Sequence, residues 1–260
     1  ARYANGLLLL ALLLVPLERF FGTPAAPGPA ATGTNVAYYF INSLITPRLT
    51  GIALALLVSA ASLLIPAGGV LPGVHSWPWW MRLLPALAIS ELCGYWAHRA
   101  LHAHPWLWRL HRIHHSPARM NWLVNTRAHP LELVFSRSCS LLPLYVLGFA
   151  HGSGSSPDAL APAVALVTNI WGFVIHANLR WRWRPLHALI ATPAFHHAHH
   201  AHVAQAAQSC NYAALLPLID RLFGTYAVDP VHWPARYGID ETLDPGLAGQ
   251  LLQAFGSERR

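Results

Sequence analysis

The chain has 260 residues, of which 54% are hydrophobic and only 10% are charged. A soluble domain usually carries about 25% charged residues, so this composition argues against an ordinary soluble protein and against a disordered one. The formal net charge is +7, every basic residue is an arginine, and histidine is as frequent as arginine, with 17 copies of each. An apolar chain with an excess of histidine predicts a membrane protein that binds metal ions.

Apolar segments predict the positions of membrane-spanning helices. Residues 4–17 form a short apolar run before Glu18-Arg19, which predicts a short or tilted span or an interfacial helix. Residues 22–34 are rich in Pro, Gly and Ala, which predicts a loop. Residues 49–71 contain no charge and predict a complete span.

Three further apolar segments follow, at 83–101, 138–150 and 159–178, and the loop 151–158 would join the last two as a helical hairpin. Six arginines lie between positions 99 and 137 and seven between 180 and 260, whereas the intervening loops hold only Arg82. The positive-inside rule places both Arg-rich stretches in the cytoplasm. We therefore expect an all-α, multi-pass membrane bundle of about four or five transmembrane helices with a cytoplasmic helical cap.

Most of the histidines cluster just beyond the cytoplasmic ends of these spans. Residues three or four apart share one face of a helix, so H-x3-H and H-x2-HH spacings bring imidazoles together. Pro105 and Thr192-Pro193 predict the starts of two short helices, and Ser116-Pro117 predicts the end of the first. The nine histidines in these patterns and at the end of the last span are His98, His102, His111, His114, His115, His176, His196, His199 and His200.

Imidazole is a good ligand for iron, zinc, copper and nickel. Nine imidazoles exceed what one ion accepts, so the pattern predicts two metal ions. One such histidine pair is more often structural, but the combination of motifs in one membrane protein strongly favours metal binding. His104, His197 and His202 lie beside the clusters but outside their spacing, and a direct role for them is the less favoured interpretation. The histidines with no such spacing are His75, His151, His187 and His232.

Glu91 is a candidate because an ionisable group inside a predicted span is costly and usually functional. With Tyr95, His98 and His102 it lies on one helical stripe. Metal-bound histidines commonly donate their second N–H to a carboxylate, so Glu91 is a candidate for this role. A buried ion pair with an arginine is the equally supported alternative.

His129 and Asn178 are two further candidates. His129 lies in the segment R-A-H-P-L-E, between Arg127 and Glu132. Three roles are consistent with its position: an additional metal ligand, a group that supports a ligand, or the start of a helix at Pro130. Two roles are consistent with the position of Asn178: a group that holds a metal-bound water, or a cap of the last span.

The ordered motifs resemble the fatty acid hydroxylase superfamily, which includes the sterol desaturases. The resemblance covers roughly residues 85–227. The matching stretches are E-L-C-G-Y-W-A-H-R-A-L-H (91–102), H-R-I-H-H-S-P (111–117), R-A-H-P-L-E (127–132), H-A-N (176–178), T-P-A-F-H-H-A-H-H (192–200), N-Y (211–212) and D-R-L-F-G-T-Y (220–226).

This resemblance implies a pair of non-haem irons, for which zinc could substitute, held by the nine clustered histidines. It also implies hydroxylation or desaturation of a membrane lipid, sterol or fatty acyl, with O2 and two electrons. The chain departs from the family pattern at Glu91, where Asp is frequent, at Ile219, where Trp is usual, and at Ala213, where Gly is usual. Some relatives have a further histidine near the position of Arg180, which increases the interest in His129 as a ligand.

The electrons must come from another protein, because the chain has no G-x-G-x-x-G motif, no P-loop and no cysteine cluster. A cytoplasmic basic surface could dock an acidic ferredoxin or cytochrome, and nucleic-acid binding is not expected. Anionic lipid headgroups are the alternative partner, favoured for the last three arginines of the surface. Its members are Arg109, Arg112, Arg119, Arg127, Arg180, Arg182 and Arg184.

We expect a single integral membrane oxygenase domain over residues 1–260. It comprises N-terminal spans and loops (1–82), a histidine-motif core (83–227) and a polar C-terminal tail (228–260). Two other functions stay open. A non-enzymatic metal transporter or sensor would hold its ligands near the bilayer midplane, commonly in repeated halves. A di-zinc hydrolase would need a general base, for which only Glu91 and Glu132 lie nearby.

Overall fold

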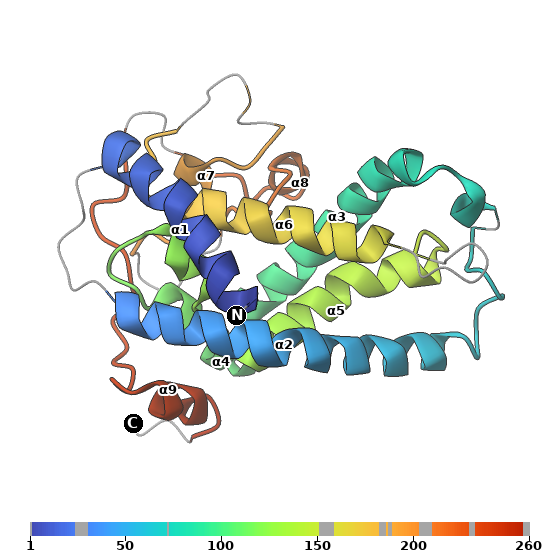
Figure 1. Ribbon diagram of the computed structural model, residues 1–260, viewed down its shortest axis with the longest axis horizontal. Helices are drawn as coiled ribbons and strands as arrows, with labels where there is room; N and C mark the ends of the chain where they lie inside the picture. The colour runs from blue at the N-terminus through green and yellow to red at the C-terminus, as the bar shows by residue number, and fades with distance from the viewer. Residues whose placement is uncertain are drawn as a thin grey trace.

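The computed structural model describes residues 2–23, 31–71, 73–150, 159–181, 186, 189–202, 210–228 and 232–256. These residues form helices joined by loops, with one isolated β-bridge between Ala201 and Tyr237, which confirms the predicted all-α class. Four helices lie along the long axis of the molecule (Figure 1), and α5 packs against both α2 and α3. They are α2 (Thr32–Ala61), α3 (Trp79–Ala103), α5 (Pro130–Val146) and α6 (Leu160–His176).

Two described helices are long and apolar enough to cross a membrane, α1 (Arg2–Phe21) and α2, and few of their side chains are buried inside the protein. This supports association with a membrane. Helix α6 is apolar but shorter, with 17 residues. Helices α3 and α6 closely match two of the predicted spans, and α5 overlaps the predicted span 138–150 but begins and ends earlier; their crossing of a bilayer stays a prediction.

The predicted limits of the 49–71 span are wrong at both ends. Helix α2 begins at Thr32, because the polar residues of its first half face inward and therefore escape a hydropathy argument. The buried Asn42 amide donates to the carbonyls of Thr126, at 3.0 Å, and Ala128, at 2.9 Å. The helix ends at Ala61, and the following turns contain Gly68 and Gly69 at positive φ. Of the predicted loop 22–34, residues 24–30 lie outside the described residues, as does the loop 151–158.

A sharp corner brings two of the histidine motifs together. Helix α3 ends at Ala103, and His104 is extended because the following proline disfavours a helical residue before it. Helix α4 (Pro105–His115) then begins at Pro105, and Ser116 is its C-cap, as predicted. The histidines of α4 thus fold back beside those at the end of α3.

The short helix α7 (Pro193–His199) carries the third histidine motif and packs against α6. It begins where the sequence predicts, because the Thr192 hydroxyl accepts the N–H of Phe195 at 3.3 Å. The remaining short elements are η1 (Val74–Ser76), η2 (Trp122–Thr126), α8 (Leu218–Leu222) and α9 (Leu247–Gln253).

A partly buried carboxylate joins α1 to the rest of the protein. Glu18 accepts the backbone N–H of Trp122, at 2.7 Å, and of Asn178, at 2.9 Å. The Asn178 side chain in turn pairs with Thr23, donating to its carbonyl and accepting from its backbone N–H. The end of α1 is therefore bonded both to the start of η2 and to the residues that follow α6.

We expect two helical glycines to respond in opposite ways to alanine. A Cβ at Gly172 of α6 would lie 2.5 Å from Oδ1 of Asn125, whereas a Cβ at Gly51 of α2 meets nothing within 4 Å. Gly172→Ala should lower the free energy of unfolding by about 1–3 kcal/mol through overpacking. Gly51→Ala, the matched control, should be neutral or stabilise by up to about 1 kcal/mol. Thermal unfolding in detergent measures both, and equal midpoints for the two variants would contradict the close contact between α6 and η2.

Candidate metal centre

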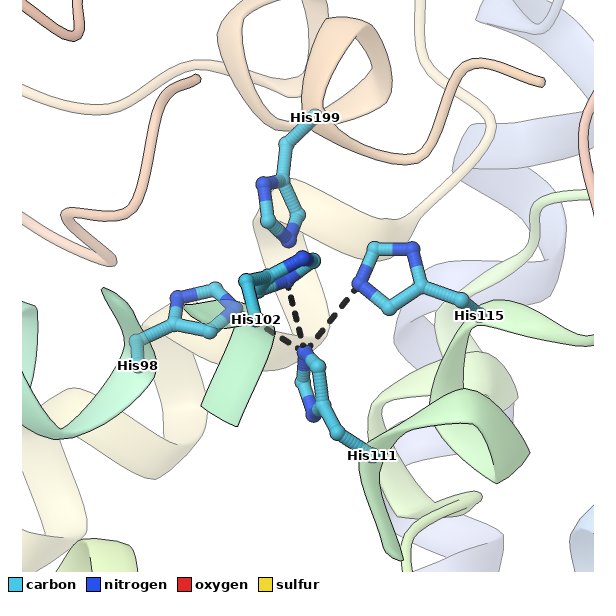
Figure 2. Close-up of side chains that lie close together, drawn as sticks. All are labelled: His98, His102, His111, His115 and His199. Atoms are coloured by element: carbon cyan, nitrogen blue, oxygen red, sulfur yellow. Dashed lines mark hydrogen bonds between the residues drawn. The ribbon is translucent and has the colours of Figure 1, made fainter. Parts of the chain in front are cut away.

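The nine histidines of the sequence motifs converge into two adjoining groups. In each group one nitrogen per imidazole lies within 4.8 Å of those of all the other members. The first group, drawn in Figure 2, comes from α3, α4 and α7 and contains His98, His102, His111, His115 and His199. The second group comes from α4, α6 and α7 with its C-cap and contains His114, His176, His196 and His200.

His111 lies at the centre of the first group. Its Nε2 is 3.2 Å from Nε2 of His98, 3.0 Å from that of His102 and 3.1 Å from that of His115 (Figure 2). A neutral imidazole carries one proton, so these three contacts cannot all be hydrogen bonds made by His111. Nε2 of His199 is buried and has no hydrogen-bond partner within the described residues.

The second group has the same form. Nε2 of His176 lies 3.1 Å from Nε2 of His114 and 3.0 Å from that of His196, and Nε2 of His200 lies 3.1 Å from that of His196. The two groups are contiguous, because the rings of His115 and His200 stack with their centroids 4.4 Å apart.

Backbone carbonyls fix the protonation of several of these rings. A carbonyl oxygen only accepts, so an Nδ1 atom bonded to one must carry the proton and leave a lone pair on Nε2. The facing Nε2 atoms of His114 and His176 are therefore two opposed lone pairs, which a bound cation would reconcile. The four bonds run from His98 to Tyr212 (2.7 Å), from His114 to Arg127 (3.1 Å), from His176 to Gly172 (2.6 Å) and from His199 to Cys210 (2.8 Å).

Glu132 is the carboxylate that contacts a histidine of the two groups, whereas Glu91, for which this role was one of two predictions, contacts backbone N–H groups. Oε1 of Glu132 accepts the Nδ1–H of His111 at 2.8 Å, and both side chains are buried. Glu91 instead accepts the backbone N–H of Leu215 and Leu216. The signal for Glu132 was its place beside the histidine motifs, in the first turn of α5.

A loop after α7 supplies two of the supporting carbonyls. Asn211 has a left-handed backbone, with φ at 57°, a conformation that asparagine tolerates better than most residues. The carbonyls on either side of it, those of Cys210 and Tyr212, hold His199 and His98. The loop is fastened by the Asp220 carboxylate, which accepts the N–H of Tyr212 at 2.7 Å. Asn211 and Asp220 belong to the predicted motifs, but the sequence did not indicate this role.

Burial keeps the histidines of α4 and α7 neutral. Desolvation lowers the pKa of His114 to about 3, and also lowers those of His115, His199 and His200 well below the usual value. Neutral imidazole is the form that binds metal, so at neutral pH these ligand atoms need no deprotonation.

The other candidates lie outside the two groups. His129 caps α5, since its Nδ1 accepts the N–H of Leu131 at 3.1 Å, while its Nε2 lies 3.3 Å from the carbonyl of Leu251. Both nitrogens of His129 are thus engaged away from the histidine groups. Asn178 pairs with Thr23 and does not face them. His104 is exposed, and His202 pairs with the exposed Asp240 at 2.8 Å.

Two of the described arginines of the predicted basic surface are buried. Arg112 is buried in an ion pair with Glu241 at 2.6 Å, and Arg127 is buried and donates to the Ser116 hydroxyl. Arg180 is exposed, and Arg109 and Arg119 are partly exposed. Four residues named in the sequence analysis lie outside the described part of the chain, namely Arg182, Arg184, His151 and His187.

We expect Glu132→Gln to weaken binding of Fe²⁺ by about tenfold or more, because an amide replaces the carboxyl group that orients the His111 ring through Nδ1. Glu91→Gln is the matched control, since its carboxylate contacts backbone N–H groups. It should lower the thermal midpoint and reduce the affinity much less than Glu132→Gln does, because Glu91 contacts no histidine directly. Competition with a chelator measures the affinity, and an equal loss in the two variants would reject the role of Glu132.

We expect the metal-free protein to lose stability as the pH falls below about 6.5. In this range the histidines of the unfolded chain take up protons, whereas His114 and His197, with pKa values lowered by burial to about 3 and about 4, stay neutral in the folded state. Each such group contributes a loss of up to about 1.4 kcal/mol per pH unit. Thermal midpoints between pH 7.5 and 5.5 test this. A constant or rising midpoint would be inconsistent with neutral buried histidines.

Known proteins are similar to this chain in sequence. An ornithine lipid hydroxylase from Rhizobium tropici is 34% identical over 185 residues, which are 71% of this chain and 53% of that protein. An alkylglycerol monooxygenase from Danio rerio is 29% identical over 157 residues, 60% of this chain and 32% of that protein. A very-long-chain aldehyde decarbonylase from Oryza sativa subsp. indica is 32% identical over 149 residues, 55% of this chain and 51% of that protein.

The chain thus spans about half of the first and third of these relatives and about a third of the second. No solved structure matches it significantly. The sequence profile of the fatty acid hydroxylase family matches residues 83–225, which is more than half of the chain and includes all nine histidines of the two groups. The chain belongs to the fatty acid hydroxylase family.

Proposed function

We propose that this protein is a membrane-bound di-iron oxygenase that hydroxylates or desaturates a C–H bond of a lipid. It would use O2 and two electrons from a separate donor. The observation that carries the proposal is the convergence of nine imidazoles into two contiguous groups with their Nε2 atoms facing one another. Membership in the family supports the reaction class.

Each histidine group would hold one iron ion. The first iron would be bound by His98, His102, His111, His115 and His199, and the second by His114, His176, His196 and His200. Neutral nitrogen ligands suit Fe²⁺. Bound iron would supply the activation of O2 for attack on an unactivated C–H bond. The chain's own residues hold the Nε2 lone pairs in place through their Nδ1 bonds and keep water out by burial.

The supporting groups have distinct tasks in this proposal. Glu132 stabilises the orientation of His111 and increases its basicity as a ligand. Glu91 acts indirectly. It accepts the backbone N–H of Leu215, in the same loop as the Tyr212 carbonyl, and that carbonyl bonds to His98. His129 and Asn178 keep neighbouring segments in place and bind no iron.

The substrate would be a membrane lipid. Helices α1 and α2 are suited to a bilayer, so the chain meets its substrate there. Two relatives are named for an ornithine lipid and an alkylglycerol. These names favour a lipid with a polar headgroup and a hydrocarbon chain over a sterol, and the reaction would take place on that chain.

The electron donor would be an acidic ferredoxin or cytochrome on the cytoplasmic side. The arginines that are accessible for docking are Arg109, Arg119 and Arg180. Attraction between opposite charges accelerates the encounter of such partners, and salt weakens this attraction.

The proposal also keeps the organisation of residues 1–260 as a single domain.

The two nearby carboxylates argue against a di-zinc hydrolase. A hydrolase needs a general base that can reach a metal-bound water. Glu91 is occupied with backbone N–H groups, and Glu132 with the ring of His111. A transporter or sensor would place its ligands at the bilayer midplane in broken helices. Here they gather in α4, in α7 and at the ends of α3 and α6.

We expect detergent-purified protein to contain two irons per chain, with the Mössbauer spectrum of a coupled pair. His114→Ala and His199→Ala should each abolish loading of the iron pair, because each removes a buried ligand from one group. His104→Ala is the matched control, since this histidine is exposed and lies outside both groups. Elemental analysis measures the content. Two zincs and no iron after anaerobic iron loading would overturn the proposal.

Activity is tested with membranes of the producing host, a chemical reductant and ¹⁸O2. Incorporation of ¹⁸O into a lipid identifies a hydroxylase, and loss of two hydrogens without incorporation identifies a desaturase. Either product supports an oxygenase if it disappears in the His114→Ala variant. An iron-loaded protein that consumes no O2 with any host lipid would count against the reaction.

A further inference from the structure

Residues 232–256 form a strap that packs against the helices of the metal centre. We call this segment the C-terminal strap. It begins after the part of the chain that matches the family, which ends at residue 225. The sequence predicts a C-terminal tail here, polar from residue 240 apart from one short amphipathic piece, and within the segment Tyr237 and Gln250 are buried. Residues 257–260 lie outside the described part of the chain.

The strap holds α4 from the side of Arg112. Glu241, which is partly exposed, forms the ion pair with the buried Arg112 at 2.6 Å, and its other oxygen accepts the indole N–H of Trp108 at 3.3 Å. Gln250 of α9 accepts from the hydroxyl of Tyr38 at 3.2 Å. The strap is therefore bonded to α4, which carries three of the nine histidines, and to α2.

The strap also pairs with the residues that follow α7. The N–H of His202 donates to the carbonyl of Arg236 at 2.8 Å, and Ala201 forms a β-bridge with Tyr237. These bonds bring the Tyr237 hydroxyl to Nδ1 of His197, at 3.0 Å. His197 is fully buried, and its ring also contacts Trp233 of the strap.

His197 connects α7 to the end of α6. Its Nε2 lies 3.1 Å from the carbonyl of Ala177, the C-cap of α6. Because a carbonyl only accepts, Nε2 must carry the ring proton and Nδ1 must hold the lone pair. Nδ1 therefore accepts the Tyr237 hydroxyl proton. Tyr237 thus stabilises the one tautomer of His197 that can bond to Ala177.

This connection lies next to the second histidine group. Ala177 follows His176, and His197 follows His196 in the chain. The Nε2 atoms of His176 and His196 face each other at 3.0 Å. The bond between His197 and Ala177 lies one residue further along both segments, so it sets the separation of α6 and α7 beside these two proposed ligands. His197 itself points away from both groups and ligates nothing in them.

We propose that Tyr237 and His197 are positioning residues for the iron bound by the second histidine group. Tyr237 fixes the tautomer of His197, and His197 holds the His176 end of α6 at the distance that His196 requires. The inference rests on the proposed di-iron function. It assigns the C-terminal strap a role in the metal centre, because the strap delivers the tyrosine.

We expect Tyr237→Phe to change one iron and spare the other. The phenylalanine keeps the packing of the ring against Met120 and Val124 and removes only the hydroxyl. In ⁵⁷Fe-loaded protein the Mössbauer signal of one iron should shift while the other stays as in the wild type. Chelator-driven release of that iron should be about tenfold faster, the size typical for loss of a group that orients a metal ligand.

Tyr226→Phe is the matched control. Tyr226 also packs its ring against α7, with its centroid 5.7 Å from that of Phe195, and the substitution also removes one hydroxyl. It should leave both iron signals unchanged. Unchanged signals and release in Tyr237→Phe would overturn the proposal, as would an equal change at both irons, which indicates general loosening of the fold.

A pair of substitutions at His197 gives a second test. His197→Gln keeps an amide N–H that can donate to the Ala177 carbonyl, whereas His197→Leu keeps the bulk and removes the donor. We expect the glutamine variant to retain more of the wild-type signal of the affected iron than the leucine variant. Equal spectra in the two variants would reject the bond to Ala177 as the cause.

We call the two bonds from Tyr237 to His197 and from His197 to Ala177 the relay. Failure of the relay is distinguishable from failure of the proposed function. The function fails if wild-type protein binds no iron pair. The relay is then read from Co²⁺-substituted protein, whose visible absorption reports ligand geometry without any turnover. A change in the Co²⁺ spectrum of Tyr237→Phe but not of Tyr226→Phe supports the relay, and identical spectra in the two variants overturn it.

Discussion

Opposed lone pairs are the constraint on which the rest of this structure depends. Imidazole nitrogens that face one another at about hydrogen-bond distance, without protons between them, repel each other in a buried site. The pair formed by His114 and His176 is fixed in this state, because backbone carbonyls hold the proton of each ring on Nδ1. Backbone carbonyls outside the histidine groups thus keep these ring protons on Nδ1. A cation bound between the Nε2 atoms would remove the repulsion.

Local signals made much of the site predictable from the sequence. Helix starts at Pro105 and Pro193 depend on the residue itself and its neighbours, so the sequence shows them directly. Histidine spacing then determines which rings share a face. The nine predicted histidines accordingly fall in the two groups, and His129, which has neither spacing, lies elsewhere.

Partners that are distant in the sequence made the rest unpredictable. Glu91 and the N–H of Leu215 are separated by 124 residues, so nothing local distinguished this bond from a contact with a nearby histidine. The inward polar side chains of α2 hid its first half from a hydropathy argument, since their partners near Thr126 are about as remote. The strap was read as a tail for the same reason, because Glu241 and Arg112 are 129 residues apart.

The order of the segments along the chain has a consequence for biosynthesis. The histidines are drawn from residues 98–200, the carbonyls that orient His98 and His199 come later, at Tyr212 and Cys210, and the Tyr237 hydroxyl comes later still. A ribosome therefore releases the earlier ligands before their orienting partners exist. Metal sites seldom preform in an incomplete chain. In the proposed di-iron protein, capture of metal would accordingly follow synthesis of the segment that carries Tyr237.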